Sequence, residues 1–388
     1  MKKHVPALDG VRGAAIIAVL LYHFAAVSYA GKGRMLALVG MGINATWVGV
    51  DLFFVLSGFL ITGILLDTAG DAQYFRKFYL RRALRIFPLY FGVIFVLLAA
   101  TALLHLRWNG TIPYLLLYGQ NFIFERLIIG GDTQIHLMHT WSLAVEEQFY
   151  LVWPMVVLLA GTRRRLRQIL MVTIVACLSL RFIALGNGLS RYDVYFWTPF
   201  RIDTLAWGAL MCVLLRELDR ERMFRVARGL VVGGLAGVAW VSVLRGGFDF
   251  VDPLVQTVGY TALGALFAGL LVLVVQHRYA LDRMASMPVL RWFGRYSYGI
   301  YIFHALTLEV VGSARMWVTA MTHSAALGAA TQIVMGFSLS GGVAFLSYRY
   351  YESHWLRMKD RLAGRPRLEL VPRRVKTAGR GLRLRIGR

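Results

Sequence analysis

The chain has 388 residues, of which 58% are hydrophobic and 16% are charged, and its mean hydropathy is +0.58. A soluble domain of this length could not bury so much apolar surface, so the composition predicts a protein embedded in lipid. The formal net charge of +23 would suit a nucleic-acid-binding protein. In a membrane protein, however, the distribution of basic residues among the loops decides what the charge means.

Ten apolar segments are long enough to cross a hydrocarbon core of roughly 30 Å, which takes about 20 helical residues. A further apolar run at 112–124 is too short to cross, and we expect it to be re-entrant or interfacial. The predicted fold is all-α, a polytopic membrane bundle of about ten transmembrane helices. The predicted spans are 11–28, 43–66, 86–105, 143–160, 167–185, 199–215, 229–244, 254–275, 296–311 and 324–348.

The basic residues predict the orientation of this bundle. With the N-terminus in the cytoplasm, 33 of the 43 Lys and Arg residues fall in segments on the cytoplasmic side. This asymmetry predicts an N-in, C-in protein, and it explains the net charge without nucleic acid as a partner. We expect the protein in the inner membrane of a bacterium-like cell. We expect a membrane-embedded domain at 1–355 and a basic cytoplasmic tail at 356–388 that is disordered or lies on anionic lipid.

The first span contains a titratable residue inside an apolar run. The stretch "LDGVRGAAIIAVLLYHF" begins near Arg12 and holds His23 about 17 Å further along, on the same helical face. A cleaved signal peptide is the alternative, because Lys2 and Lys3 precede the run and "SYA" at 28–30 resembles a cleavage site. The interruption by His23 and the even number of spans favour a membrane helix. An unpaired polar group in hydrocarbon costs several kilocalories, so His23 is either a hydrogen-bonded core histidine or a functional residue.

Carboxylates lie at a similar predicted depth in three other spans. Asp51 follows "WVGV", Glu146 and Glu147 follow "WSLAV", and Asp203 follows "FRI". Buried charges need partners or water. We therefore expect one polar cavity, open to the outer side, with His23, Asp51, Glu146 or Glu147, and Arg201 or Asp203 around it.

The cytoplasmic boundary carries a different chemistry. In "FYLRRALRIFPLY", Arg82 and Arg85 share one helical face, and Arg12 lies at the same boundary. Guanidinium groups bind phosphate and pyrophosphate well, although every inner loop is basic and the pair could be ordinary orientation anchors. A substrate with a phosphorylated head and a long thin arm could reach from these arginines to His23. Coenzyme A thioesters have that shape.

Several motifs together resemble one family. Arg12-x10-His23, "GVDLFFVLSGFLIT", "FYLRRALRIFPLY", "WSLAVEEQFYLVWP" and "SYGIYIFHA" are similar to the acyltransferase-3 family of integral membrane acyltransferases, over about residues 4–355. The resemblance implies transfer of an acyl group, commonly acetyl, from cytoplasmic acyl-CoA to a hydroxyl of an extracytoplasmic carbohydrate or glycoside. It implies that His23 is the essential histidine, that Arg12 is its partner, and that Arg82 and Arg85 bind acyl-CoA. It also places Glu146 and Glu147 in the acidic pair of the family.

Two mechanisms and one other function stay open. His23, with its basicity raised by a carboxylate, can act as a general base on the acceptor, or it can carry the acyl group itself. Asp51, a further candidate for the catalytic site, can orient a cationic group or make a structural hydrogen bond. A proton-coupled transporter of a glycan or lipid would use a similar histidine and carboxylate layer. For His304, packing and catalysis are both open. We expect no metal, because Cys177 and Cys212 lack ligand spacing and are read as packing residues, and the oligomeric state is left open.

Overall fold

The computed structural model describes residues 6–26, 34–108, 110–123, 137–276 and 280–363. These residues form a bundle of helices without strands, confirming the predicted all-α class. Eight helical stretches are long and apolar enough to cross a membrane. The total of ten spans remains a prediction. The eight stretches are Pro6–Ala25, Met35–Thr68, Tyr74–Ala99, Met138–Ala160, Arg163–Gly186, Arg220–Arg245, Val255–Val275 and Ala325–Ala363.

The N-terminal half supplies the helices α1 (Pro6–Ala25), α2 (Arg34–Asn44), α3 (Gly49–Thr68) and α4 (Tyr74–Ala99), with the 3-10 turn η1 (Ala45–Val48) before α3. Short helices follow, namely α5 (Thr101–Leu104), α6 (Ile112–Leu116), η2 (Gln120–Phe122) and η3 (Met138–Thr140). The apolar run 112–124 thus forms two short helices rather than a span. Residue 124 and the "SYA" sequence at 28–30 lie outside the described residues.

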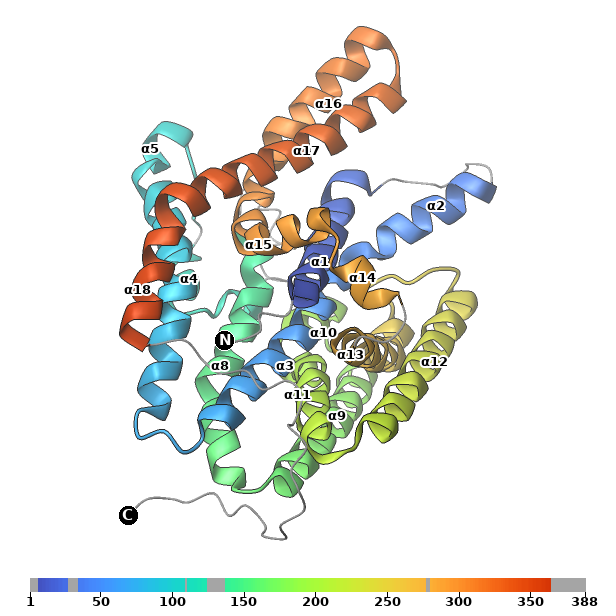
Figure 1. Cartoon of the computed structure of the whole chain (residues 1–388). Helices are drawn as coiled ribbons and strands as arrows, with labels where there is room; N and C mark the ends of the chain where they lie inside the picture. The colour runs from blue at the N-terminus through green and yellow to red at the C-terminus, as the bar shows by residue number, and fades with distance from the viewer. Residues whose placement is uncertain (1–5, 27–33, 109, 124–136, 277–279, 364–388) are drawn as a thin grey trace.

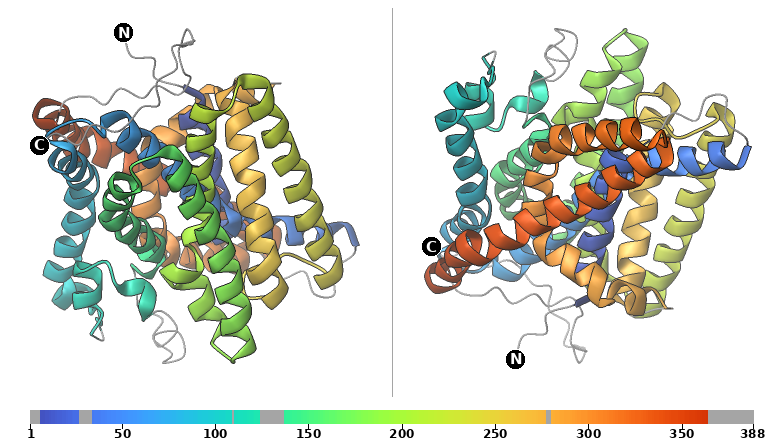
Figure 2. Two further views of the ribbon diagram at one scale, coloured as in Figure 1. Left: turned by 90° about the horizontal axis from the view of Figure 1, so that it is seen from below. Right: turned by 90° about the horizontal axis from the view of Figure 1, so that it is seen from above.

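The middle of the chain forms α8 (Trp141–Ala160), α9 (Arg163–Gly186), α10 (Arg191–Phe196), η4 (Thr198–Phe200), α11 (Ile202–Glu217), α12 (Arg220–Arg245), the π-turn η5 (Val255–Gly259) and α13 (Tyr260–Val275). The predicted sixth span corresponds to α11, a helix of 16 residues. The helices α12 and α13 lie side by side along one flank of the bundle (Figures 1 and 2). Cys177 and Cys212 are buried and free.

The C-terminal part forms α14 (Leu281–Ala285), α15 (Pro288–Phe303), η6 (Ala305–Thr307), α16 (Leu308–Thr322), α17 (Ala325–Ser347), the π-turn η7 (Tyr348–Glu352) and α18 (Ser353–Ala363). The predicted span 296–311 is therefore wrong as a single helix. Thr307 and its neighbours form a 3-10 turn after His304, and α16 then pairs with α17 in a hairpin that projects from the bundle (Figure 1).

Glycines let the central helices approach closely. A Cβ on Gly58 of α3 would lie 1.9 Å from the carbonyl oxygen of Leu205, and a Cβ on Gly208 of α11 would lie 1.8 Å from that of Val55. These are reciprocal contacts of backbone on backbone, which membrane helices use in place of a hydrophobic driving force. The contact holds α3 and α11 together in the centre of the bundle, next to α1 and α13.

The tail predicted at 356–388 begins inside α18. Its first eight residues, 356–363, belong to this helix, which lies against α4 at the edge of the bundle (Figures 1 and 2). The Arg81 side chain donates two hydrogen bonds to the carbonyl of Ala363, and the Tyr351 hydroxyl donates one of 3.0 Å to the carbonyl of Pro88. These two contacts show that α18 runs antiparallel to α4. Residues 364–388 lie outside the described part of the chain.

Candidate active site

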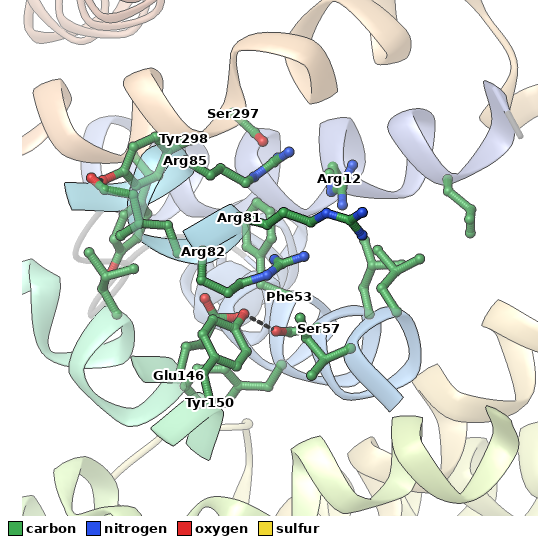
Figure 3. Close-up of a pocket in the computed structure, with 18 of the residues that line it drawn as sticks. Arg12, Phe53, Ser57, Arg81, Arg82, Arg85, Glu146, Tyr150, Ser297 and Tyr298 are labelled. Atoms are coloured by element: carbon green, nitrogen blue, oxygen red, sulfur yellow. Dashed lines mark hydrogen bonds between the residues drawn. The ribbon is translucent and has the colours of Figure 1, made fainter. Parts of the chain in front are cut away.

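A cavity of about 350 Å³ lies where α1, α3, α4, α8, α15 and α18 meet. The three arginines predicted to bind the donor, Arg12, Arg82 and Arg85, all line it (Figure 3). They come from α1 and from one face of α4, as the spacing of the two arginines in α4 predicts. The same cavity is lined by Arg81 and by Lys359, which the sequence did not indicate.

The arginines in the cavity have few partners among the described residues. Arg12 lies 3.5 Å from the carboxylate of Asp9, a long ion pair within one helix turn. The guanidinium of Arg82 lies over the rings of Phe78 and Tyr150, at 5.9 and 5.7 Å from the ring centroids, and its Nε has no hydrogen-bond partner. A guanidinium with an N–H donor that has no hydrogen-bond partner can bind an anionic ligand.

Of the two adjacent glutamates, only Glu146 lines the cavity. Glu146 lines the cavity with the arginines, near the hydrogen-bonded hydroxyls of Ser57 and Tyr150 (Figure 3). Glu147 does not line it, because adjacent residues on a helix point about 100° apart. The prediction that only one of the pair serves the site therefore favours Glu146. Glu146 lies beside Arg82 (Figure 3), whereas the sequence predicted that it would lie beside His23.

His23 lies in a cluster of three histidines, of which His304 is buried and His23 and His139 are partly buried. Its ring centroid is 4.7 Å from that of His304, which in turn is 4.9 Å from that of His139. The three residues come from α1, from η3 and from the break after α15. They do not form a metal-binding group within the described ranges. His139 carries no motif of its own, and only its position in the fold brings it to the cluster.

Backbone carbonyls determine the tautomers of two of these histidines. The Nδ1 atom of His23 lies 2.8 Å from the carbonyl oxygen of Val19, and that of His304 lies 2.7 Å from the carbonyl of Tyr301. A carbonyl only accepts, so each neutral ring carries its proton on Nδ1 and leaves Nε2 as the acceptor or base. The orienting partner of His23 is thus a carbonyl of its own helix rather than the carboxylate expected from the sequence.

Tyr301 and Ser142 connect the cavity to the histidine cluster. Both side chains line the cavity, and their hydroxyls lie 2.6 Å apart. The Tyr301 hydroxyl also donates to the carbonyl of His139. The cavity therefore reaches from the arginines to the wall behind which the histidines lie.

Asp51 and Asp203 lie outside this cavity, in two buried ion pairs. Arg201 lies 2.7 Å from Asp51, and Arg181 lies 2.7 Å from Asp203, with all four side chains almost fully buried. The guanidinium of Arg201 also lies 4.3 Å from the ring centroid of Tyr260. The single outer cavity expected from the sequence is therefore wrong. These charges pair with each other, because an isolated ion in a low-dielectric interior costs several kilocalories.

The fold and the site define a class of protein: a polytopic helical membrane protein with a cation-rich cavity beside a cluster of histidines. A family model described as an acyltransferase domain matches residues 5–351. The chain belongs to this acyltransferase family, as the motifs predicted.

Two relatives of this chain serve for comparison. The chain is 29% identical over 320 residues to the "Putative peptidoglycan O-acetyltransferase YrhL" of Bacillus subtilis, covering 78% of this chain and 48% of that protein. It is 29% identical over 342 residues to the "Peptidoglycan O-acetyltransferase OatA" of Listeria monocytogenes, covering 78% of this chain and 49% of that protein. The chain thus spans about half the length of these relatives. No solved structure matches it.

Proposed function

We propose that this chain is an O-acyltransferase that moves an acetyl group from acetyl-CoA on the cytoplasmic side to a hydroxyl of a cell-wall carbohydrate on the other side. The observation that supports this most directly is the cavity that begins among Arg12, Arg82 and Arg85 and ends at Ser142 and Tyr301. The ring centroid of Tyr301 lies 5.6 Å from that of His304, the neighbour of His23. The names of the relatives make peptidoglycan the first acceptor to test.

In the proposed reaction the arginines hold the phosphates of the donor and the thioester lies toward the histidines. Nε2 of His23 takes the proton from the acceptor hydroxyl while the oxygen attacks the thioester carbonyl carbon. A carbon–oxygen bond forms, the carbon–sulfur bond breaks, and the CoA thiolate takes the proton from the imidazolium. In the alternative order, Nε2 attacks the thioester carbon first, the carbon–sulfur bond breaks and CoA leaves as the thiolate. The acceptor oxygen then attacks the acyl-imidazole, the carbon–nitrogen bond breaks, and the hydroxyl proton passes to the CoA thiolate.

The test incubates membranes that contain the protein with acetyl-CoA, labelled with 14C in its acetyl group, and with peptidoglycan fragments as acceptor. Membranes that contain His23→Gln protein are the control. We expect label in the glycan only with the unchanged protein, and release of the label by mild alkali, as for an ester. If the glycan crosses the membrane without being modified, the chain is a transporter and the proposal is wrong.

A further inference from the structure

The last helix contributes to the cation-rich cavity. Lys359 and Asp360 of α18 line it together with Arg81, Arg82 and Arg85 of α4. These residues are separated by more than 270 positions in the chain, and they meet because α18 returns to pack along the N-terminal half of α4 (Figure 1). Lys359 lies one turn before Ala363, whose carbonyl binds Arg81. It is therefore level with the two arginines of the donor site.

The charges of the cavity do not balance. Five cationic and three carboxylate side chains line it, so two positive charges are in excess when all are ionised. Arg81 is already held by Ala363, and Arg12 is close to Asp9. Like charges at close range repel each other, so an anionic ligand with more than one phosphate group would stabilise this arrangement.

The position of Lys359 favours one part of such a ligand. The helix α18, which supplies Lys359 and Asp360 to the cavity, lies at the edge of the bundle (Figure 1). Ser142 and Tyr301 instead mark the wall next to the histidines. In a CoA thioester the ribose 3′-phosphate is the group furthest from the reacting carbonyl. A phosphomonoester suits the compact ammonium of a lysine, and a pyrophosphate suits the forked arginines.

We propose that Lys359 binds the 3′-phosphate of the CoA donor, so that α18 makes the site selective for CoA over dephospho-CoA. This inference rests on the proposed function for the identity of the donor. It adds a residue and a group-specific contact that the motifs of α1 and α4 do not supply.

The experiment compares two donors that differ only in this phosphate, acetyl-CoA and acetyl-dephospho-CoA, on unchanged and Lys359→Met protein. Methionine keeps most of the length of the side chain and removes its charge. We expect the KM for acetyl-CoA to rise roughly tenfold to hundredfold, as for loss of a charge-assisted contact. The KM for acetyl-dephospho-CoA and both kcat values should change little. Lys359→Arg should restore part of the selectivity, and Arg361→Ala, which removes an exposed charge from the same helix, should leave both KM values unchanged.

Binding measured by thermal unfolding of the purified protein keeps this test independent of catalysis. CoA should raise the Tm of the unchanged protein more than dephospho-CoA does, and the difference should vanish in Lys359→Met. An equal rise in KM for both donors, or unaltered selectivity in the variant, would overturn the role of Lys359 while leaving the proposed function intact. Selective binding of CoA without any transfer would instead overturn the proposed function.

Discussion

At the scale of single residues, His23 is the proposed base, and its Nε2 atom is the ring nitrogen left to accept a proton. The carbonyl of Val19 fixes the proton on Nδ1, and the neighbouring ring of His304 packs against it. We expect His23→Gln to insert and fold but to transfer acetyl at least ~10²-fold more slowly, because an amide cannot take the proton as a general base does. The measurement is the initial rate in membranes normalised to the amount of protein. Substantial transfer by well-expressed His23→Gln protein would refute a catalytic role.

The dependence of the transfer rate on pH in the unchanged protein also tests the role of His23. A protonated imidazole has no lone pair on Nε2, so we expect the rate to fall as the pH is lowered through the range in which His23 takes up its proton. The profile of kcat against pH measures this. A rate that stays constant on acidification would show that no neutral imidazole is needed.

Arg82 and Arg85 line the cavity, as does Arg81, whose side chain is held by the carbonyl of Ala363. We expect Arg82→Ala or Arg85→Ala to raise the KM for acetyl-CoA roughly tenfold to hundredfold and to change the KM for the acceptor little. Arg76 is exposed on the same helix and lies outside the cavity, so Arg76→Ala is the matched control. An unchanged KM for acetyl-CoA in correctly inserted variants would show that Arg82 and Arg85 do not bind the donor and only help to set the orientation of the protein in the membrane.

At the scale of helices, the contact between α3 and α11 depends on the absence of two side chains. A methyl group at position 208 would meet the backbone of Val55 at 1.8 Å, and backbone cannot turn away as a flexible side chain can. We expect Gly208→Ala to separate the helices and to destabilise the fold by about 1–3 kcal/mol or more. Thermal unfolding in detergent measures the loss. Gly233 of α12 has open space around its Cβ position, so Gly233→Ala should be neutral or slightly stabilising.

At the scale of the whole molecule, the distribution of charge predicts which side of the membrane each loop occupies. Ala72, between α3 and α4, is predicted to face the cytoplasm, and Asn187, after α9, to face outward; both are exposed. We expect a membrane-impermeant thiol reagent to label Asn187→Cys in intact cells and Ala72→Cys only after permeabilisation. Cys177 and Cys212 are buried and should not contribute. The reverse pattern would invert the proposed orientation of donor and acceptor.

The sequence by itself determined the class of fold, the family and the shared helical face of Arg82 and Arg85. In lipid, a long apolar segment satisfies the hydrogen bonds of its backbone by forming a helix. Arg82 and Arg85 share a face of their helix because of their spacing, independently of how the helices pack. Helix depth could not show which charges meet, because depth fixes height along the membrane normal but not position within the membrane plane. Only the tertiary structure paired Asp51 with Arg201, placed Glu146 beside Arg82, brought His139 and His304 to His23, and returned Lys359 to the cavity. These are contacts between distant parts of the chain, and packing in three dimensions decides them.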